Sequence, residues 1–245
     1  MHPNIENKVA VVTGGSRGIG FRVAEALVEN GASVVIGARK EADVRRATEA
    51  LNQLAASRAE GITMDVRDYS QVEQLMAFAE RKFGGIDILV NNAGIGIFGP
   101  VDELTPEEWD AVIGTNLSGA FYCVRAAAPR MKQRGGGYIF NISSLAGKNA
   151  FAGAAAYNAS KFGLNGFSEA MMLDLRYANI RTSYIMPGSV ETDFGSSPSG
   201  RTQSAAASWK IDAKDVAQVV VDLLKSEPRT MLSRVEMRPS KPPRK

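Results

Sequence analysis

The chain has 245 residues, of which 44% are hydrophobic and 22% are charged, and this composition excludes disorder for most of its length. It contains one cysteine, Cys123, and one histidine, His2. No disulfide can therefore form within the chain, and we expect no metal site and no histidine-based catalysis. The net charge is +3, but its positive excess lies near the end, in residues 225–245. We therefore expect no nucleic-acid partner.

No apolar run approaches the length of a membrane span, and the first residues lack the pattern of a signal peptide. We expect a cytoplasmic protein that has no membrane partner.

Apolar, β-branched runs alternate with helical patterns along the chain. This order predicts successive βαβ units, and therefore an α/β fold in which a doubly wound, mainly parallel sheet has helices on both faces. No linker divides the chain, so residues 1–245 are predicted to form a single domain. In chain order, the predicted strand and helix pairs are 9–13 and 17–29, 33–36 and 43–55, 61–66 and 71–83, 86–91 and a long helix from about Pro106, 138–143 and 155–175, followed by a strand at 181–186.

The last part of the chain is less regular. Residues 188–209 are rich in Ser, Gly and Ala and show no period, so we interpret them as a lid over a substrate site. A final helix is predicted over 213–224. We interpret residues 239–245, which are basic and contain prolines, as a flexible, solvated tail.

Three glycines mark the turn between the first strand and the first helix, at Gly14, Gly18 and Gly20. Such a turn lets the backbone approach a pyrophosphate, which the helix N-terminus attracts. The spacing is one residue wider than the usual dinucleotide motif, so a simple glycine-rich turn is the alternative. The predicted phosphate-binding residues of the turn are Gly14, Ser16, Arg17, Gly18, Ile19 and Gly20.

The end of the second strand indicates which dinucleotide binds. NAD enzymes place an acid there for the ribose hydroxyl, whereas a 2′-phosphate needs a cation. Here Ala38 is followed by Arg39 and Lys40, and Arg17 comes from the neighbouring turn. These cations favour NADP, with NAD possible as the alternative cofactor. Arg39 and Lys40 also fit a second interpretation, as ordinary surface charges.

Asp65 and Val66 end the third predicted strand, in the position of an adenine-binding pair. Asp65 fits equally well as the cap of the following helix.

Tyr157 and Lys161 lie four residues apart on a predicted helix and therefore share one face. A lysine cation beside a tyrosine favours the phenolate and lowers the pKa of the phenol. A phenol tuned in this way can exchange a proton with a carbonyl oxygen. Alone, the pair also fits an ordinary helix surface.

Together these motifs resemble the short-chain dehydrogenase/reductase family over most of the chain. The resemblance implies a three-layer Rossmann-type fold of about seven strands and an oxidoreductase that uses a nicotinamide cofactor. The matching segments are Thr13–Gly20, Asn91–Gly94, Thr115–Leu117, Ile142–Ser144, Tyr157–Lys161, and Pro187-Gly188 followed by Thr192.

The resemblance also implies roles for four side chains. Tyr157 is the expected proton donor, and Lys161 lowers its pKa and holds the nicotinamide ribose. Ser144, thirteen residues before the tyrosine, is expected to bind the substrate oxygen. Asn116 is similar to the residue that supports a proton-relaying water chain; its other interpretation, which can coexist, is a polar side chain bonded at a helix kink.

By the same resemblance, Asn91 or Asn92, Ala93 and Gly94 contact the adenosine side of the cofactor. A structural role, in which the asparagines bond to the backbone of the sheet, fits as well. The nicotinamide end is assigned to Pro187, Gly188, Val190 and Thr192.

The expected reaction is the NADP-dependent reduction of a ketone or 3-oxoacyl carbonyl, since the chain resembles the 3-oxoacyl-acyl-carrier-protein reductase branch except at its C-terminal end. The alternatives are an NAD-dependent secondary-alcohol dehydrogenase and a non-catalytic nucleotide sensor. The expected partners are a small carbonyl or alcohol substrate and further copies of the chain, as a dimer or tetramer. Substrate candidates are Gly96, Phe98, Ser144, Phe151 and Gly188, where the two phenylalanines also fit ordinary packing.

Overall fold

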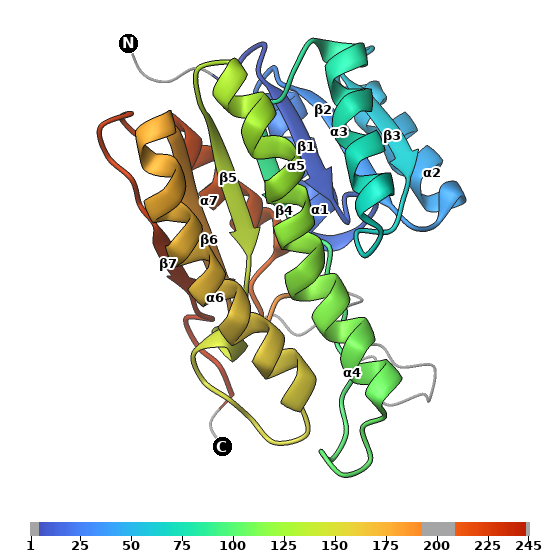
Figure 1. The fold of residues 1–245 in the computed structure, drawn as a ribbon, viewed down its shortest axis with the longest axis vertical. Coiled ribbons are helices and arrows are strands. Elements are labelled where there is room, and N and C mark those ends of the chain that lie inside the picture. The colour runs from blue at the N-terminus through green and yellow to red at the C-terminus, as the bar shows by residue number, and fades with distance from the viewer. Residues whose placement is uncertain (1–4, 193–208, 244–245) are drawn as a thin grey trace.

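A computed structural model describes residues 5–192 and 209–243. Strands and helices alternate along these residues, as Figure 1 shows. The strands are β1 (Val9–Thr13), β2 (Ser33–Ala38), β3 (Ala59–Thr63), β4 (Ile88–Asn91), β5 (Gly137–Ile142), β6 (Ile180–Pro187) and β7 (Arg234–Met237). The helices are α1 (Gly18–Glu29), α2 (Glu41–Leu54), α3 (Tyr69–Phe83), α4 (Pro106–Ile113), α5 (Gly119–Gln133), α6 (Ala155–Leu175) and α7 (Ala213–Lys225).

All seven strands pair in parallel, in the order β3-β2-β1-β4-β5-β6-β7. The order reverses between β1 and β4, where Val11 lies beside Leu89. In open α/β sheets, ligands bind outside the carboxyl ends of the strands at such a switch point. The topology therefore places a ligand site at the ends of β1 and β4, and it confirms the predicted doubly wound sheet.

Two apolar layers cover the sheet, because successive side chains of a strand point to opposite faces. Ala10 and Val12 of β1 pack with residues of α1, α2 and α7. Val11, between them, packs on the other face with residues of α3, α5 and α6. In Figure 1 α3, α5 and α6 lie in front of the sheet. The three-layer prediction is thus confirmed.

The long helix predicted from Pro106 is interrupted. Thr105 caps its start, because its hydroxyl accepts from the Glu108 N–H while the Glu108 carboxylate accepts from the Thr105 N–H. A π-helical turn at Gly114–Ser118 then separates α4 from α5. Such turns are often found at functional sites, and this one contains Asn116.

The third strand ends earlier than predicted. Thr63, its last residue, pairs with Ala38 at the end of β2, so the ladder has no partner beyond it. Met64, Asp65 and Val66 consequently lie in the connection after the strand. Among residues 5–192 and 209–243, every helix is too short or too polar to cross a lipid bilayer.

Candidate active site

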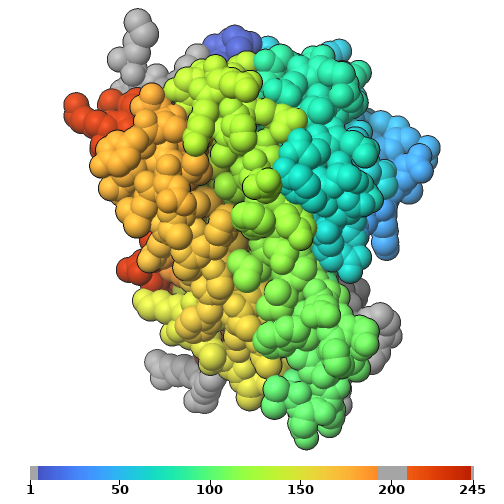
Figure 2. Space-filling view, viewed as in Figure 1, coloured from blue at the N-terminus to red at the C-terminus, as the bar shows by residue number. Residues whose placement is uncertain are grey.

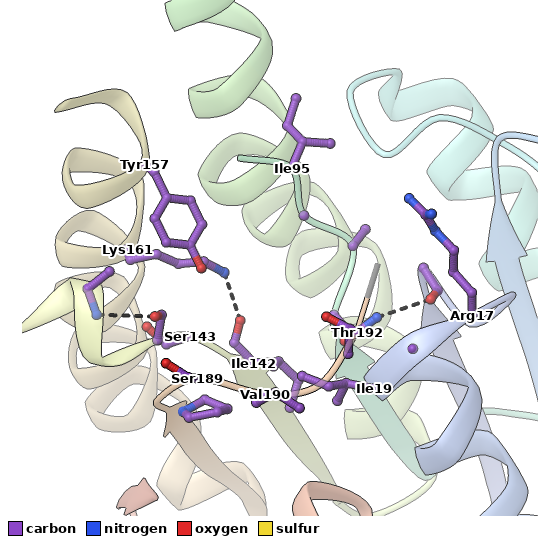
Figure 3. A pocket seen from close by; sticks show the side chains of 18 of the residues that line it. Arg17, Ile19, Ile95, Ile142, Ser143, Tyr157, Lys161, Ser189, Val190 and Thr192 are labelled. Carbon is purple, nitrogen blue, oxygen red and sulfur yellow. Dashed lines mark hydrogen bonds between the residues drawn. The ribbon is translucent and has the colours of Figure 1, made fainter. Parts of the chain in front are cut away.

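A cavity of about 1050 Å³ opens at the carboxyl ends of the strands. Gly14 lines it after β1, Arg39 after β2, Asn92 after β4, Ser143 after β5 and Gly188 after β6. Figure 3 shows Tyr157 and Lys161 entering from one side and Arg17 and Ile19 from the other. The cavity is thus at the switch point of the sheet and is large enough for a dinucleotide with a small substrate.

Most residues predicted for the site meet in this one cavity. Gly20, Asn91, Gly96 and Asn116 do not line it. The predicted residues that do are Gly14, Ser16, Arg17, Gly18, Ile19, Arg39, Lys40, Asp65, Val66, Asn92, Ala93, Gly94, Phe98, Ser144, Phe151, Tyr157, Lys161, Pro187, Gly188, Val190 and Thr192.

The glycine turn has the geometry of a close backbone approach. Gly14 has a φ of +64°, and a Cβ there would lie 2.9 Å from Cα of Ala93. A Cβ on Gly20 would lie 2.4 Å from the carbonyl oxygen of Gly14. Gly20 is therefore required for packing between helix and turn rather than for lining the cavity.

The N-terminus of α1 is suited to an anion. Arg17, its N-cap, makes no side-chain capping bond, and the first turn contains no acid. The side chain of Arg17 therefore does not occupy the first N–H groups of the helix. The positive end of the helix dipole also lies at the cavity. A Cβ on Gly18 would lie 3.5 Å from Cγ2 of Thr192, so the glycine turn faces the segment after β6. These features fit a dinucleotide pyrophosphate.

A charged pair follows β3. Both carboxylate oxygens of Asp65 accept hydrogen bonds from the Arg67 guanidinium, the shortest of the three at 2.7 Å. This guanidinium lowers the pKa of Asp65 from its usual value. Asp65 does not cap the next helix, because Asp68 caps α3 by accepting from Ser70 and Gln71. The capping interpretation of Asp65 is thus wrong.

The two asparagines after β4 separate in role. Asn92 donates to the backbone oxygens of Thr13 and Gly14, both at 3.1 Å, and also lines the cavity. Asn91 is buried, donates to Asn141 on β5 at 2.9 Å and does not line the cavity. The interpretation that Asn92 bonds to the backbone of the sheet is confirmed. The side chain of Asn91 does not reach the cavity in which an adenosine contact was predicted.

Tyr157 and Lys161 point into the cavity from α6 (Figure 3). The Lys161 Nζ donates to the carbonyl oxygen of Ile142 at 2.9 Å and lies 5.8 Å from the centre of the Tyr157 ring. Burial lowers the pKa of Lys161 to about 8. Burial also raises the pKa of Tyr157, and a hydrogen bond with Ser144 offsets part of this rise. The expectation of a lowered tyrosine pKa is therefore wrong in this structure, because desolvation of the phenol dominates.

Ser143 and Ser144, which follow β5, have different hydrogen-bond partners. The Ser143 hydroxyl donates to Oδ1 of Asn165 at 2.5 Å, and Ser143 is buried. The Ser144 hydroxyl accepts from the Ala146 N–H at 3.1 Å and bonds with Tyr157. Ser144 is consequently the serine that shares hydrogen bonds with the tyrosine.

Asn116 ties the π-helical turn to the rim of the site. Its amide donates to the Ile95 carbonyl at 2.9 Å and to Ser160 at 3.0 Å, and its oxygen accepts from the Ile95 N–H at 2.8 Å. Asn116 is 1% exposed. The interpretation as a polar side chain bonded at a helix kink is confirmed, and these bonds hold Ile95, which lines the cavity.

Aromatic rings surround Tyr157 in the cavity. The Phe98 ring centre lies 5.7 Å from that of Tyr157 and 6.3 Å from that of Phe151. Phe98 and Phe151 are 47% and 51% exposed, so neither is an ordinary core residue. Of the predicted lid, residues 193–208 lie outside the described part of the chain, while Gly188, Ser189, Val190, Thr192 and Trp209 line the cavity.

Some of the cavity residues that the sequence interpretation missed come from the C-terminal end. Arg238, Pro239, Pro242 and Pro243 line the cavity, although residues 239–245 were predicted to be a solvated tail. Lys210 and Asn149 also line it. No local pattern marks the four C-terminal residues, because only the packing of β7 beside β6 brings the end of the chain to the site.

Comparisons with known proteins agree with this geometry. The family model described as short chain dehydrogenase matches residues 8–201. The chain belongs to the short-chain dehydrogenase/reductase family. The protein is therefore an oxidoreductase of this family. A 3alpha-hydroxysteroid dehydrogenase of Mediterraneibacter gnavus is 38% identical over 190 residues, which are 77% of this chain and 76% of the relative.

Solved structures of the family have the same fold. A metagenomic short-chain oxidoreductase in complex with NADP is 36% identical, with a TM-score of 0.84 over 98% of this chain and 100% of that one. An alcohol dehydrogenase from Thermococcus sibiricus, complexed with 5-hydroxy-NADP, is 26% identical, with a TM-score of 0.88 over 97% and 99% of the two chains. A nicotinamide dinucleotide is thus bound in both of these relatives.

Proposed function

We propose that this protein is an NADP-dependent reductase that converts a ketone or 3-oxoacyl-type carbonyl into a secondary alcohol. The observation that carries the proposal is the convergence of Tyr157, Ser144 and Lys161 on the cavity that the glycine turn also lines. NADP(H) supplies the hydride in this chemistry. The structures of two relatives with NADP or its 5-hydroxy derivative support the choice of cofactor class.

Each side chain has a separate role in this proposal. The hydride adds to the carbonyl carbon while Tyr157 gives its phenolic proton to the carbonyl oxygen, so a secondary alcohol forms and Tyr157 is later reprotonated from solvent. Ser144 donates to the substrate oxygen and stabilises the charge that develops on it. Lys161 holds the ribose next to the nicotinamide.

The preference for NADP rests on charge. Arg17, Arg39 and Lys40 line the adenosine side of the cavity, and Ala38 stands where an NAD enzyme has its acid. Guanidinium groups bind a 2′-phosphate through paired, charge-assisted hydrogen bonds. Oxidation of a secondary alcohol with NAD is the alternative within the same site, and a nucleotide sensor is the alternative without chemistry.

We also propose that the protein forms a homo-oligomer. Large apolar side chains are exposed on the adjacent helices α4, α5 and α6, whose surface faces the viewer in Figure 2. They are Trp109, Phe121, Phe162 and Leu173. An exposed apolar surface of this kind is typical of an interface between protein copies. Sedimentation velocity of the wild type and of a Phe121→Glu, Phe162→Glu double variant tests this, and a monomeric wild type would contradict it.

The test of the enzymatic proposal is a fluorescence titration with NADPH and with NADH, followed by cofactor oxidation against a panel of 3-oxoesters, diketones, quinones and aldehydes. We expect tighter binding of NADPH and turnover of at least one carbonyl. Tight binding without turnover would favour the sensor, tighter NADH binding would favour the NAD alternative, and no binding of either would overturn the proposed cofactor site.

A further inference from the structure

The chain after β7 packs against the candidate active site. Met237, the last residue of β7, accepts a hydrogen bond from the Gly188 N–H at 2.8 Å. A Cβ on Gly188 would lie 3.1 Å from Cδ of Pro239 and 3.2 Å from Cδ1 of Leu145. Pro239 therefore lies beside the segments that follow β5 and β6. In Figure 1 the chain accordingly runs from β7 toward the end of the molecule where α6 begins.

Charged pairs set the direction of this segment. The Glu236 carboxylate binds Nζ of Lys148 at 2.7 Å and Nη2 of Arg238 at 3.1 Å. Lys148 belongs to the connection between β5 and α6, which also provides Asn149 to the cavity. Exposed ion pairs add little stability. The Lys148 pair nevertheless joins the end of β7 to the connection that lines the cavity.

We call residues 238–243 the C-terminal wall. Pro239, Pro242 and Pro243 line the cavity, and Pro242 and Pro243 are exposed, so they lie at its rim. Prolines have a fixed φ and lose little freedom when a ligand orders them. The same cavity contains the half-exposed rings of Phe98 and Phe151. Apolar surface of this extent inside a binding cavity is typical of a site that buries an apolar ligand.

We propose that the C-terminal wall is part of the substrate subsite and, together with Phe98 and Phe151, makes the enzyme select bulky, ring-containing apolar ketones over small aliphatic ones. This inference rests on the proposed reductase function. A small ketone leaves the proline and phenylalanine surfaces in water, whereas a fused-ring ketone covers them. Each apolar group buried in such a pocket contributes about tenfold or more to discrimination.

The direct test compares two truncated chains. One ends at Arg238 and lacks most of the wall, and its matched control ends at Pro243 and lacks only Arg244 and Lys245. The ratio of kcat/KM for 2-decalone to that for 2-butanone is measured with NADPH. We expect this ratio to fall about tenfold in the chain ending at Arg238, while its affinity for NADPH is unchanged. In the control chain we expect the ratio to equal that of the full-length protein. An unchanged ratio in the chain ending at Arg238 would overturn the inference.

A second measurement needs neither truncation nor turnover. Cys123, the natural cysteine, is fully buried, and burial raises the pKa of its thiol to about 12, so it does not compete for a maleimide. In a Pro242→Cys variant, 2-decalone with NADP⁺ should slow maleimide labelling several-fold relative to NADP⁺ alone. Ser240→Cys is the control, because Ser240 is exposed and does not line the cavity. Equal protection of both thiols, or of neither, would contradict a wall at Pro242.

The two proposals fail in different ways. If NADPH binds but no ketone is reduced, the reductase function fails while the labelling experiment still reports on the wall. If both ketones are reduced but truncation leaves their ratio unchanged, the reductase function stands and the wall is excluded.

Discussion

Lys161 on α6 donates a hydrogen bond to the carbonyl oxygen of Ile142 at the end of β5, across 2.9 Å. This bond fixes the lysine head group at the junction of helix and sheet. Lys161 is 5% exposed, and its burial lowers the pKa from 10.5 to about 8. One backbone oxygen therefore replaces the hydration of a buried cation, at a cost in folding stability.

This cost predicts a pH dependence. Below about pH 8 the lysine is charged in both the folded and the unfolded state, so its burial destabilises the fold. Between about pH 8 and pH 10.5 the unfolded state binds more protons, so the free energy of unfolding gains up to about 3 kcal/mol from this group as pH rises. In Lys161→Met this rise of the free energy of unfolding with pH should disappear, which urea unfolding from pH 7 to 10 measures. The exposed Lys225→Met is the control, and parallel curves for wild type and Lys161→Met would contradict the prediction.

Tyr157→Phe removes the proposed proton donor and leaves the ring in place. We expect kcat/KM for ketone reduction to fall about 10³-fold. NADPH affinity should change little, because the phenol acts on the substrate oxygen. Steady-state kinetics and fluorescence titration measure the two quantities, and Tyr177→Phe, which alters a fully exposed tyrosine, is the matched control. Substantial activity in Tyr157→Phe would remove Tyr157 as the donor.

The two serines after β5 should differ in their effects. Ser144→Ala removes the partner of Tyr157 and should lower kcat by about 10²-fold with little loss of stability. Ser143→Ala removes the bond to Asn165, so it should lower the melting temperature and leave kcat nearly unchanged. Kinetics and thermal unfolding of both variants decide the assignment, and the reverse pattern would make Ser143 the catalytic serine.

Arg39→Ala should lower the affinity for NADPH by about tenfold or more and change the affinity for NADH little, because only NADPH carries a 2′-phosphate. Titration of both cofactors measures the difference. Arg45→Ala is a control on α2, since Arg45 is exposed and does not line the cavity. Equal losses for NADPH and NADH would show that Arg39 does not recognise the phosphate.

Asn116→Ala should lower the free energy of unfolding by about 2 kcal/mol, because it leaves the partly buried N–H and carbonyl of Ile95 without this partner. Chemical denaturation measures the loss. Gln218→Ala, at an exposed position of α7, should change stability by only a few tenths of a kcal/mol. If both variants lose the same amount, the bonds of Asn116 do not stabilise the turn.

The sequence by itself determined the features that depend on local chemistry. Alternating apolar runs predicted the parallel sheet, the glycines at 14, 18 and 20 predicted the turn at α1, and the spacing of Tyr157 and Lys161 placed both on one helix face. These signals are readable because strand and helix periods, and the conformational freedom of glycine, act over a few residues.

Only the tertiary structure decided the rest. The raised pKa of Tyr157 follows from burial within the fold, and Asn91 bonds to Asn141 on the neighbouring strand β5 instead of lining the cavity. Asn116 acquires its partner Ile95 through the fold, and Pro239 reaches Gly188 because β7 pairs with β6. Each of these depends on contacts between residues far apart in the chain or on desolvation, and no local pattern in the sequence encodes either one.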